Sequence, residues 1–127
     1  MGLYALVGAL SMAVGVALGA FGAHALKKRV SADSLRIWET ANRYHFAHAL
    51  GLFAVAWLIG ELDGHYQSMA RWAGMLHCVG TVLFSGSLYV MTVRRMKWLG
   101  PITPLGGLAW IAGWVCLAAA AYGLPLG

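Results

Sequence analysis

Four long runs without a charged residue constrain the fold of this chain more than any other feature. They cover residues 3–26, 44–60, 72–93 and 104–122. A membrane-spanning helix needs about 20 mainly apolar residues, because the hydrocarbon core of a bilayer is about 30 Å thick. The 24-residue first run would be about 36 Å long as a helix. The pattern predicts an all-α membrane protein with four transmembrane helices in an antiparallel bundle.

The composition agrees with a membrane protein. Only 10% of the 127 residues are charged and 61% are hydrophobic, whereas a soluble domain has roughly 25% charged residues. No Lys or Arg precedes the first run, although a signal peptide would carry positive charge there. We therefore expect residues 1–127 to form a single membrane domain with the first run retained. Cys78 and Cys116 lie in separate apolar runs and are expected to be small buried hydrophobic residues.

The second run has only 17 residues, so its helix is expected to begin earlier, near Asp33 or Ser34. One side of that helix would be mainly apolar or aromatic, with Leu35, Trp38, Ala41, His45 and His48 at helical spacing. The other side would carry Arg36, Glu39 and Arg43, the last two at the spacing of a supportive ion pair. Residues 31–43 therefore predict a short interfacial helical segment that leads into the second span.

The two ends of the fourth span are marked by different signals. Thr103 is placed to cap the helix, and Pro104 would occupy its first position, where no backbone hydrogen bond is lost. Gly123 and Pro125 would end the helix after about Tyr122.

The cations predict an orientation. Residues 27–43 and 94–97 hold eight of them, whereas the connection at residues 61–71 holds only Arg71. Cytoplasmic loops are enriched in Lys and Arg, so we expect a multi-pass protein of the bacterial inner membrane with both termini outside the cytoplasm. The net charge of +5 is explained by these loops, and a nucleic-acid partner is not expected.

Small and polar residues predict how the helices pack. The first span carries a stripe of small residues at spacing four, namely Ser11, Gly15, Gly19 and Ala23. The fourth span carries Gly106, Gly107 and Gly113. Such residues let helices approach closely in lipid, and we favour packing within one chain over self-association. The third span carries His77, Thr81, Ser85 and Tyr89 on one face, which is expected to point into the bundle.

Four motifs in order resemble a known family. They are GAFGAHAL at the end of the first span, Tyr44-His45-Phe46-Ala47-His48, GTVLFSGSLY in the third span and PITPLGG at the start of the fourth. Together they resemble the small bacterial membrane proteins called domain of unknown function 423, whose animal relative is transmembrane protein 256. The resemblance implies four spans and no established reaction. The family's motif histidines match His24 and His48, and its tyrosine matches Tyr44, whereas His45 matches no motif position.

These motifs are predicted to meet in the cytoplasmic half of the membrane, where His24 would form one wall of a polar pocket. An ionisable residue inside a membrane is a functional-site hypothesis by default. The alternative is that these histidines only hydrogen-bond across helix contacts. His65 is expected to be exposed, and His77 structural. The candidate ligand-binding residues are His24, Tyr44, His48, Ser85, Ser87, Tyr89 and Thr103.

The sequence leaves the role of this site open. Two or three histidines do not complete a zinc site, axial haem ligation by His24 and His48 is sterically awkward, and no carboxylate in the spans orients a base for Ser85 or Ser87. Transport would require an oligomer, because no repeat is evident. No metal, catalytic residue or cofactor is assigned, and an enzyme is not expected. The leading hypothesis is an accessory protein that binds a membrane-protein partner or itself; the alternative is a pocket for a quinone or lipid head group.

Overall fold

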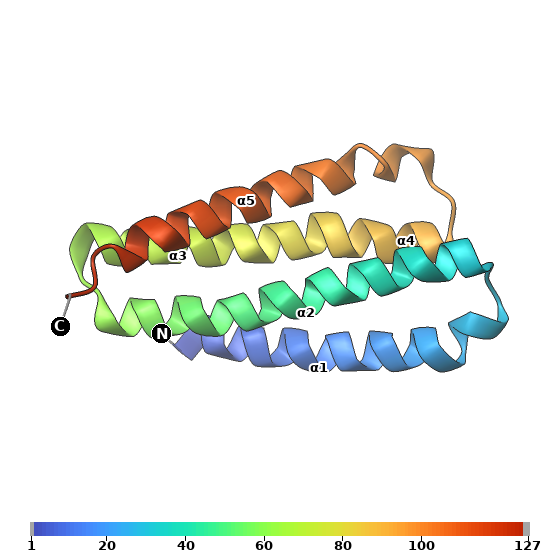
Figure 1. Cartoon of the computed structure of the whole chain (residues 1–127), viewed down its shortest axis with the longest axis horizontal. Helices are drawn as coiled ribbons and strands as arrows, with labels where there is room; N and C mark the ends of the chain where they lie inside the picture. The colour runs from blue at the N-terminus through green and yellow to red at the C-terminus, as the bar shows by residue number, and fades with distance from the viewer. Residues whose placement is uncertain (1, 126–127) are drawn as a thin grey trace.

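The computed structural model describes residues 2–125, in which the chain forms four long antiparallel helical rods and no strand (Figure 1). The third rod is continuous but changes its helix type in the middle. Short 3-10 turns, η1 (Leu26–Lys28) and η3 (Lys97–Leu99), lie in two connections. The rods are α1 (Gly2–His24), α2 (Ala32–Glu61), α3 (Gly64–Gly80) with the π-helical segment η2 (Thr81–Gly86) and α4 (Ser87–Val93), and α5 (Ile102–Ala121). The all-helical prediction is confirmed.

Three stretches of the described residues are long and apolar enough to cross a membrane: Gly2–Lys28, Gly64–Val93 and Lys97–Ala121. The rod α2 is not among them, although it is the longest helix. Its first turns carry charged residues and its uncharged part covers only residues 44–60, which is short of the roughly 20 residues that a span needs. That α2 also crosses the membrane, which would make four spans, therefore stays a prediction.

The helix α2 begins where the sequence indicates. Ser31 caps it, because the Ser31 side chain accepts a hydrogen bond from the backbone N–H of Ser34 at 3.2 Å. The helix then continues to Glu61 without a break, so the predicted interfacial segment and the second run are one element. The two predicted faces are also confirmed by burial. The ion pair on the exposed face joins Asp33 to Arg36, however, and not Glu39 to Arg43.

The third rod begins at Gly64 and not near residue 72. The turn from α2 is tight: Gly64 has φ of +54°, a conformation that glycine adopts without strain. The side chain of Gln67 closes the turn by donating to the carbonyls of Ile59 and Leu62 at 3.0 and 2.7 Å. These carbonyls lie at the C-terminal end of α2, where backbone acceptors lack helical partners.

The prediction that Thr103 caps the fourth helix is wrong. The helix α5 already begins at Ile102, and the residue before it, Pro101, makes no side-chain cap. Pro104 therefore lies in the first turn, where its missing N–H removes no helical bond. The Thr103 hydroxyl lies 2.6 Å from that of Ser87 on α4, so it joins two helices.

Glycines set the close helix contacts, as predicted. A Cβ at Gly15 of α1 would meet the Phe46 ring at 3.0 Å, and one at Gly19 would meet the Asn42 side chain at 2.9 Å. The stripe on α1 thus packs on α2 within the same chain, although Ala23 is exposed. A Cβ at Gly106 of α5 would lie 2.9 Å from the Leu83 carbonyl carbon in η2, so α5 rests directly on that backbone.

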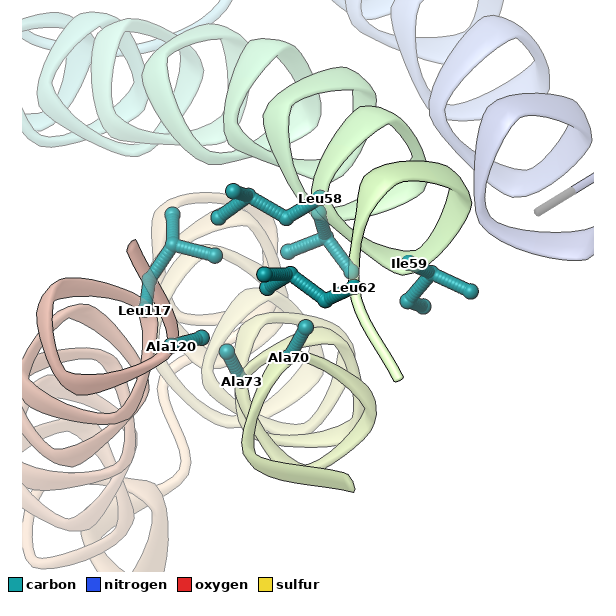
Figure 2. Packing of buried hydrophobic residues seen from close by; sticks show 8 residues of the cluster. Leu58, Ile59, Leu62, Ala70, Ala73, Leu117 and Ala120 are labelled. Carbon is teal, nitrogen blue, oxygen red and sulfur yellow. The ribbon is translucent and has the colours of Figure 1, made fainter. Parts of the chain in front are cut away.

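The larger buried apolar cluster lies at the end of the bundle that contains the α2–α3 turn, and a smaller one surrounds Trp38 and Tyr89. Figure 2 shows Leu58 of α2 and Leu62, the residue after its last turn, pointing toward Leu117 and Ala120 of α5. The small residues Ala70 and Ala73 of α3 lie beneath them, and both are fully buried. The connection at this end, residues 61–71, contains one cation, Arg71. The connections at residues 25–31 and 94–101, which carry most of the cations, lie together at the opposite end (Figure 1).

Candidate functional site

His48 lies in the wall of a groove between α2, η2 and α5. The groove has a volume of about 380 Å³, within the range of small-molecule sites. We call it the aromatic groove, and its lining residues are Tyr44, His48, Phe84, Gly107, Trp110, Ile111 and Trp114. Tyr44, Ile111 and Trp114 are exposed, so the groove opens on the outer surface of the bundle.

The His48 ring is held on two sides. It stacks on Trp110 with ring centroids 3.6 Å apart and planes 7° from parallel. Its Nδ1 atom lies 2.7 Å from the carbonyl oxygen of Tyr44 in the preceding turn. A carbonyl only accepts, so Nδ1 carries the proton. In the neutral ring Nε2 is then a lone-pair acceptor, and it has no hydrogen-bond partner among the described residues.

His77 of α3 lies behind the groove and is fully buried. Its ring centroid is 5.5 Å from that of His48 and 4.6 Å from that of Trp114. Its Nδ1 atom is 2.7 Å from the carbonyl of Ala73 and therefore carries the proton. Among the side chains of residues 2–125, its Nε2 is the one buried polar atom without a partner. Buried polar groups rarely stay unpaired, so this atom indicates that a hydrogen-bond donor is missing from the region around His77.

His45 lies on a different side of α2, in a network that joins α1, α2 and α4. Asn42 donates from Nδ2 to the Gly15 carbonyl at 2.9 Å and to the Tyr89 hydroxyl at 3.0 Å. The Tyr89 hydroxyl also lies 3.1 Å from Nδ1 of His45, and the Ser11 hydroxyl lies 2.9 Å from Nε2. In a neutral ring one nitrogen donates and the other accepts, and a hydroxyl can take either role. Both nitrogens of this buried ring are therefore satisfied.

The remaining candidate residues serve separate contacts. Ser85 is fully buried and donates to the carbonyl of Ala41 on α2 at 2.8 Å. Ser87 donates to the Phe84 carbonyl at 2.9 Å and contacts Thr103. The prediction that the third span turns its polar face inward is confirmed, because His77, Ser85 and Tyr89 are buried and Thr81 is partly buried.

His24 does not lie with the others. It is the last residue of α1, its side chain is exposed, and it is absent from the lining of the aromatic groove. The expectation that His24 forms a wall of a shared pocket is therefore wrong. The structure brings Tyr44 and His48 together at the groove, places Tyr89 in the His45 network, and pairs Ser87 with Thr103.

Sequence reasoning gave too little weight to three residues. His45 and Asn42 form the central network, and Trp110 forms the floor under His48. The signal for His45 was its position three residues before His48 on one predicted helix face. Asn42 stood at the edge of the charged segment, and its burial depends on contact with α1. Among the described residues, no three His, Cys, Asp or Glu side chains lie close enough together to hold a metal ion.

Comparison with known proteins identifies the family. The model of the family "Protein of unknown function (DUF423)" matches residues 18–107, which include all four motifs. The chain belongs to this family. The predicted family membership is thus confirmed, and the match covers four of the seven groove residues, namely Tyr44, His48, Phe84 and Gly107.

Curated relatives are similar over almost their whole length. The UPF0382 membrane protein YwdK of Bacillus subtilis is 45% identical over 121 residues, or 95% of this chain and 97% of the relative. The UPF0382 membrane protein SH2409 of Staphylococcus haemolyticus is 43% identical over 92% of this chain and 93% of its own. These names describe bacterial membrane proteins of an uncharacterised family. No solved structure matches this chain.

Proposed function

We propose that this membrane protein binds a small amphiphile, a quinone or a lipid with a polar head group, in the aromatic groove. The observation that carries the proposal is the free Nε2 of His48, held at an aromatic wall by Trp110 and the Tyr44 carbonyl. Amphiphile sites combine apolar walls with a few placed polar groups. A hollow of about 350 Å³ beside Cys78 and Val82 has only apolar exposed surface, so it offers no such group.

The position of the groove agrees with entry from a membrane leaflet. Gly107 lies five residues after Ile102, the first residue of α5, or about 8 Å along the helix. The groove therefore starts a short distance from the cation-rich end of the bundle. Lys and Arg at that end would attract anionic or polar head groups.

The same proposal includes a topology. We infer that residues 1–127 form one four-span domain, in which α2 completes an antiparallel bundle with the three apolar stretches. The cation-rich connections would face the cytoplasm of a bacterial inner membrane, and both termini would lie outside. A reporter fused to the C-terminal end should be active only outside the cytoplasm. Activity inside the cytoplasm would overturn this orientation.

An accessory role is the second candidate. It is favoured by α1, which contacts α2 chiefly and leaves Leu3, Leu6 and Leu10 more than half exposed. Lipid covers such a face as readily as a partner protein does, so this observation is weaker than the geometry of His48. A membrane-protein partner that co-purifies in fixed ratio would favour the accessory role.

Native mass spectrometry of the protein extracted gently from its own membrane tests the two candidates. We expect a discrete extra mass on the wild-type chain. His48→Ala should lose this mass, whereas His24→Ala should retain it, because His24 is exposed and outside the groove. A bare wild-type chain or bare homo-oligomer would overturn the amphiphile proposal. Loss of the mass in both variants would overturn the assignment to this groove.

A further inference from the structure

We infer that the aromatic groove selects head groups that donate a hydrogen bond, such as a phenol or hydroquinone, over head groups that only accept one. This inference rests on the proposed function and names the ligand class of the same site. It follows from the protons on two histidines. His48 faces the groove with Nδ1 already bound to the Tyr44 carbonyl, so a neutral His48 presents a lone pair and no N–H.

The neutral ring is the relevant form here. No Asp or Glu lies in residues 44–60, 72–93 or 104–122, so these runs supply no carboxylate to balance a charged imidazole. An unpaired charge in an apolar interior is costly. The carboxylate nearest to His48 along α2 is that of Glu39, which is exposed and nine residues away, so it does not pair with the ring.

His77, the histidine next to His48, also provides no free hydrogen-bond donor. Its Nδ1 proton is bound to the Ala73 carbonyl, and its Nε2 is a second acceptor without a partner. The ring centroids of His48 and His77 are 5.5 Å apart, but two acceptors cannot hydrogen-bond each other. What this region lacks is a proton on a donor atom, and a ligand hydroxyl at His48 would supply one.

The other ring donors do not fill this need. The Trp110 indole N–H donates to the His77 carbonyl at 3.2 Å. The Trp114 ring inserts the far edge of its benzo ring toward Gly51, where a Cβ would meet Cη2 at 3.2 Å. The same Cβ would lie 3.0 Å from Nε2 of His77, so it is the C–H edge of Trp114, and not its N–H, that faces this acceptor. The Tyr44 hydroxyl both donates and accepts, so it discriminates less between ligand classes and requires its own control.

Two probes that differ only by a methyl group on the oxygen test the inference directly. We would measure the binding of 4-octylphenol and of its methyl ether, 4-octylanisole, to the full chain in lipid nanodiscs, with empty nanodiscs as the blank. The ether keeps the ring and chain but lacks the O–H donor. We expect it to bind on the order of tenfold more weakly, the factor for one well-formed hydrogen bond of about 1.4 kcal/mol.

Variants then locate the acceptor. His48→Phe keeps a ring on Trp110 but removes Nε2, and it should bring the phenol-to-ether ratio close to one. His48→Gln supplies an N–H donor as well as an acceptor and should also reduce the ratio. Tyr44→Phe should keep most of the preference. Helix content measured by circular dichroism checks that each variant is folded. The phenol-to-ether ratio of the wild type tests the inference even if a variant fails to fold.

The outcomes separate the two proposals. Equal binding of both probes by the wild type would overturn the donor preference and leave the groove as a binding site. A preference that survives in His48→Phe but is lost in Tyr44→Phe would also overturn it. If neither probe binds above the blank, the proposed function fails, and the inference fails with it. The matched pair of duroquinol and duroquinone under argon should repeat the preference for the donor.

Discussion

His45 and His48 lie less than one turn apart on α2, yet their surroundings are opposite. On one side, both nitrogens of His45 have partners, Ser11 and Tyr89, and Asn42 donates a further hydrogen bond to Tyr89. On the other side, His48 has one nitrogen bound to its own helix and one free at an open groove. The first arrangement holds three helices together. The second leaves Nε2 of His48 without a hydrogen-bond donor among the described residues.

The comparison teaches where to look for function in a bundle of this kind. A buried polar residue with complete hydrogen bonds stabilises a helix contact. Removing one partner destabilises the protein, because the other partner is then buried without a hydrogen bond. A polar residue with an incomplete set next to a cavity is a better candidate for binding. By this criterion the family motif residues divide into structural ones, such as Tyr89, and groove residues, such as His48.

The largest expected effect comes from separating α5 from the third rod. Gly106→Val would place its side chain against the backbone of η2, where even a Cβ would lie 2.9 Å from the Leu83 carbonyl carbon. We expect the free energy of unfolding to fall by about 3 kcal/mol, as for other overpacked sites. Unfolding by SDS in mixed micelles measures this. Gly107→Ala is the control, because its Cβ would lie an ordinary 3.8 Å from Phe84 and should change stability little.

The next effect compares the two histidines directly. His45→Phe removes two hydrogen bonds between helices, to Ser11 and Tyr89, and should lower the free energy of unfolding by about 1–2 kcal/mol. His48→Phe removes only a bond within its own helix and should cost less than about 0.5 kcal/mol. The same SDS titration decides between them. Equal losses in the two variants would show that the two sides of α2 do not differ as described.

The smallest effect concerns the contact between Ser87 and Thr103. Their hydroxyls lie 2.6 Å apart, so Ser87→Ala and Thr103→Val should each destabilise the bundle slightly. A double-mutant cycle should give a coupling of about 0.6 kcal/mol, typical of hydrogen bonds between membrane helices. Zero coupling, with a loss only in Thr103→Val, would show that the Ser87 and Thr103 hydroxyls do not stabilise the contact between their helices.

The sequence predicted the helices well because their signals are local. The apolar runs, the start of α2 near Asp33 and the two faces of α2 depend on residues near each other in the chain. The start of α3 was missed because residues 64–71 are polar and fall outside the apolar run, although they are helical. Thr103 was misplaced because Pro104 is acceptable anywhere in a first turn, so it does not fix the first residue.

The site was predicted only in part because it depends on which helices are neighbours. His48 and Tyr44 were found from their motif, but nothing local says that Trp110 lies under His48. His24 carries the same motif signal, and the structure leaves it exposed at the end of α1. The structural role of His45 depends on hydrogen bonds with Ser11 and Tyr89, which are 34 and 44 residues away in sequence.

The π-helical segment η2 has a consequence for how this chain tolerates changes in length. A π turn contains one residue more than an α turn, and η2 lies midway along the third rod. Deleting one residue there and restoring α geometry would keep Ser87 and Tyr89 on nearly the same face, because a π-helix turns less per residue than an α-helix. The same deletion in a regular α segment would rotate everything after it by about 100°. We therefore expect η2 to be the part of the third rod that accommodates the loss of one residue while Tyr89 still faces His45 and Ser87 still faces Thr103.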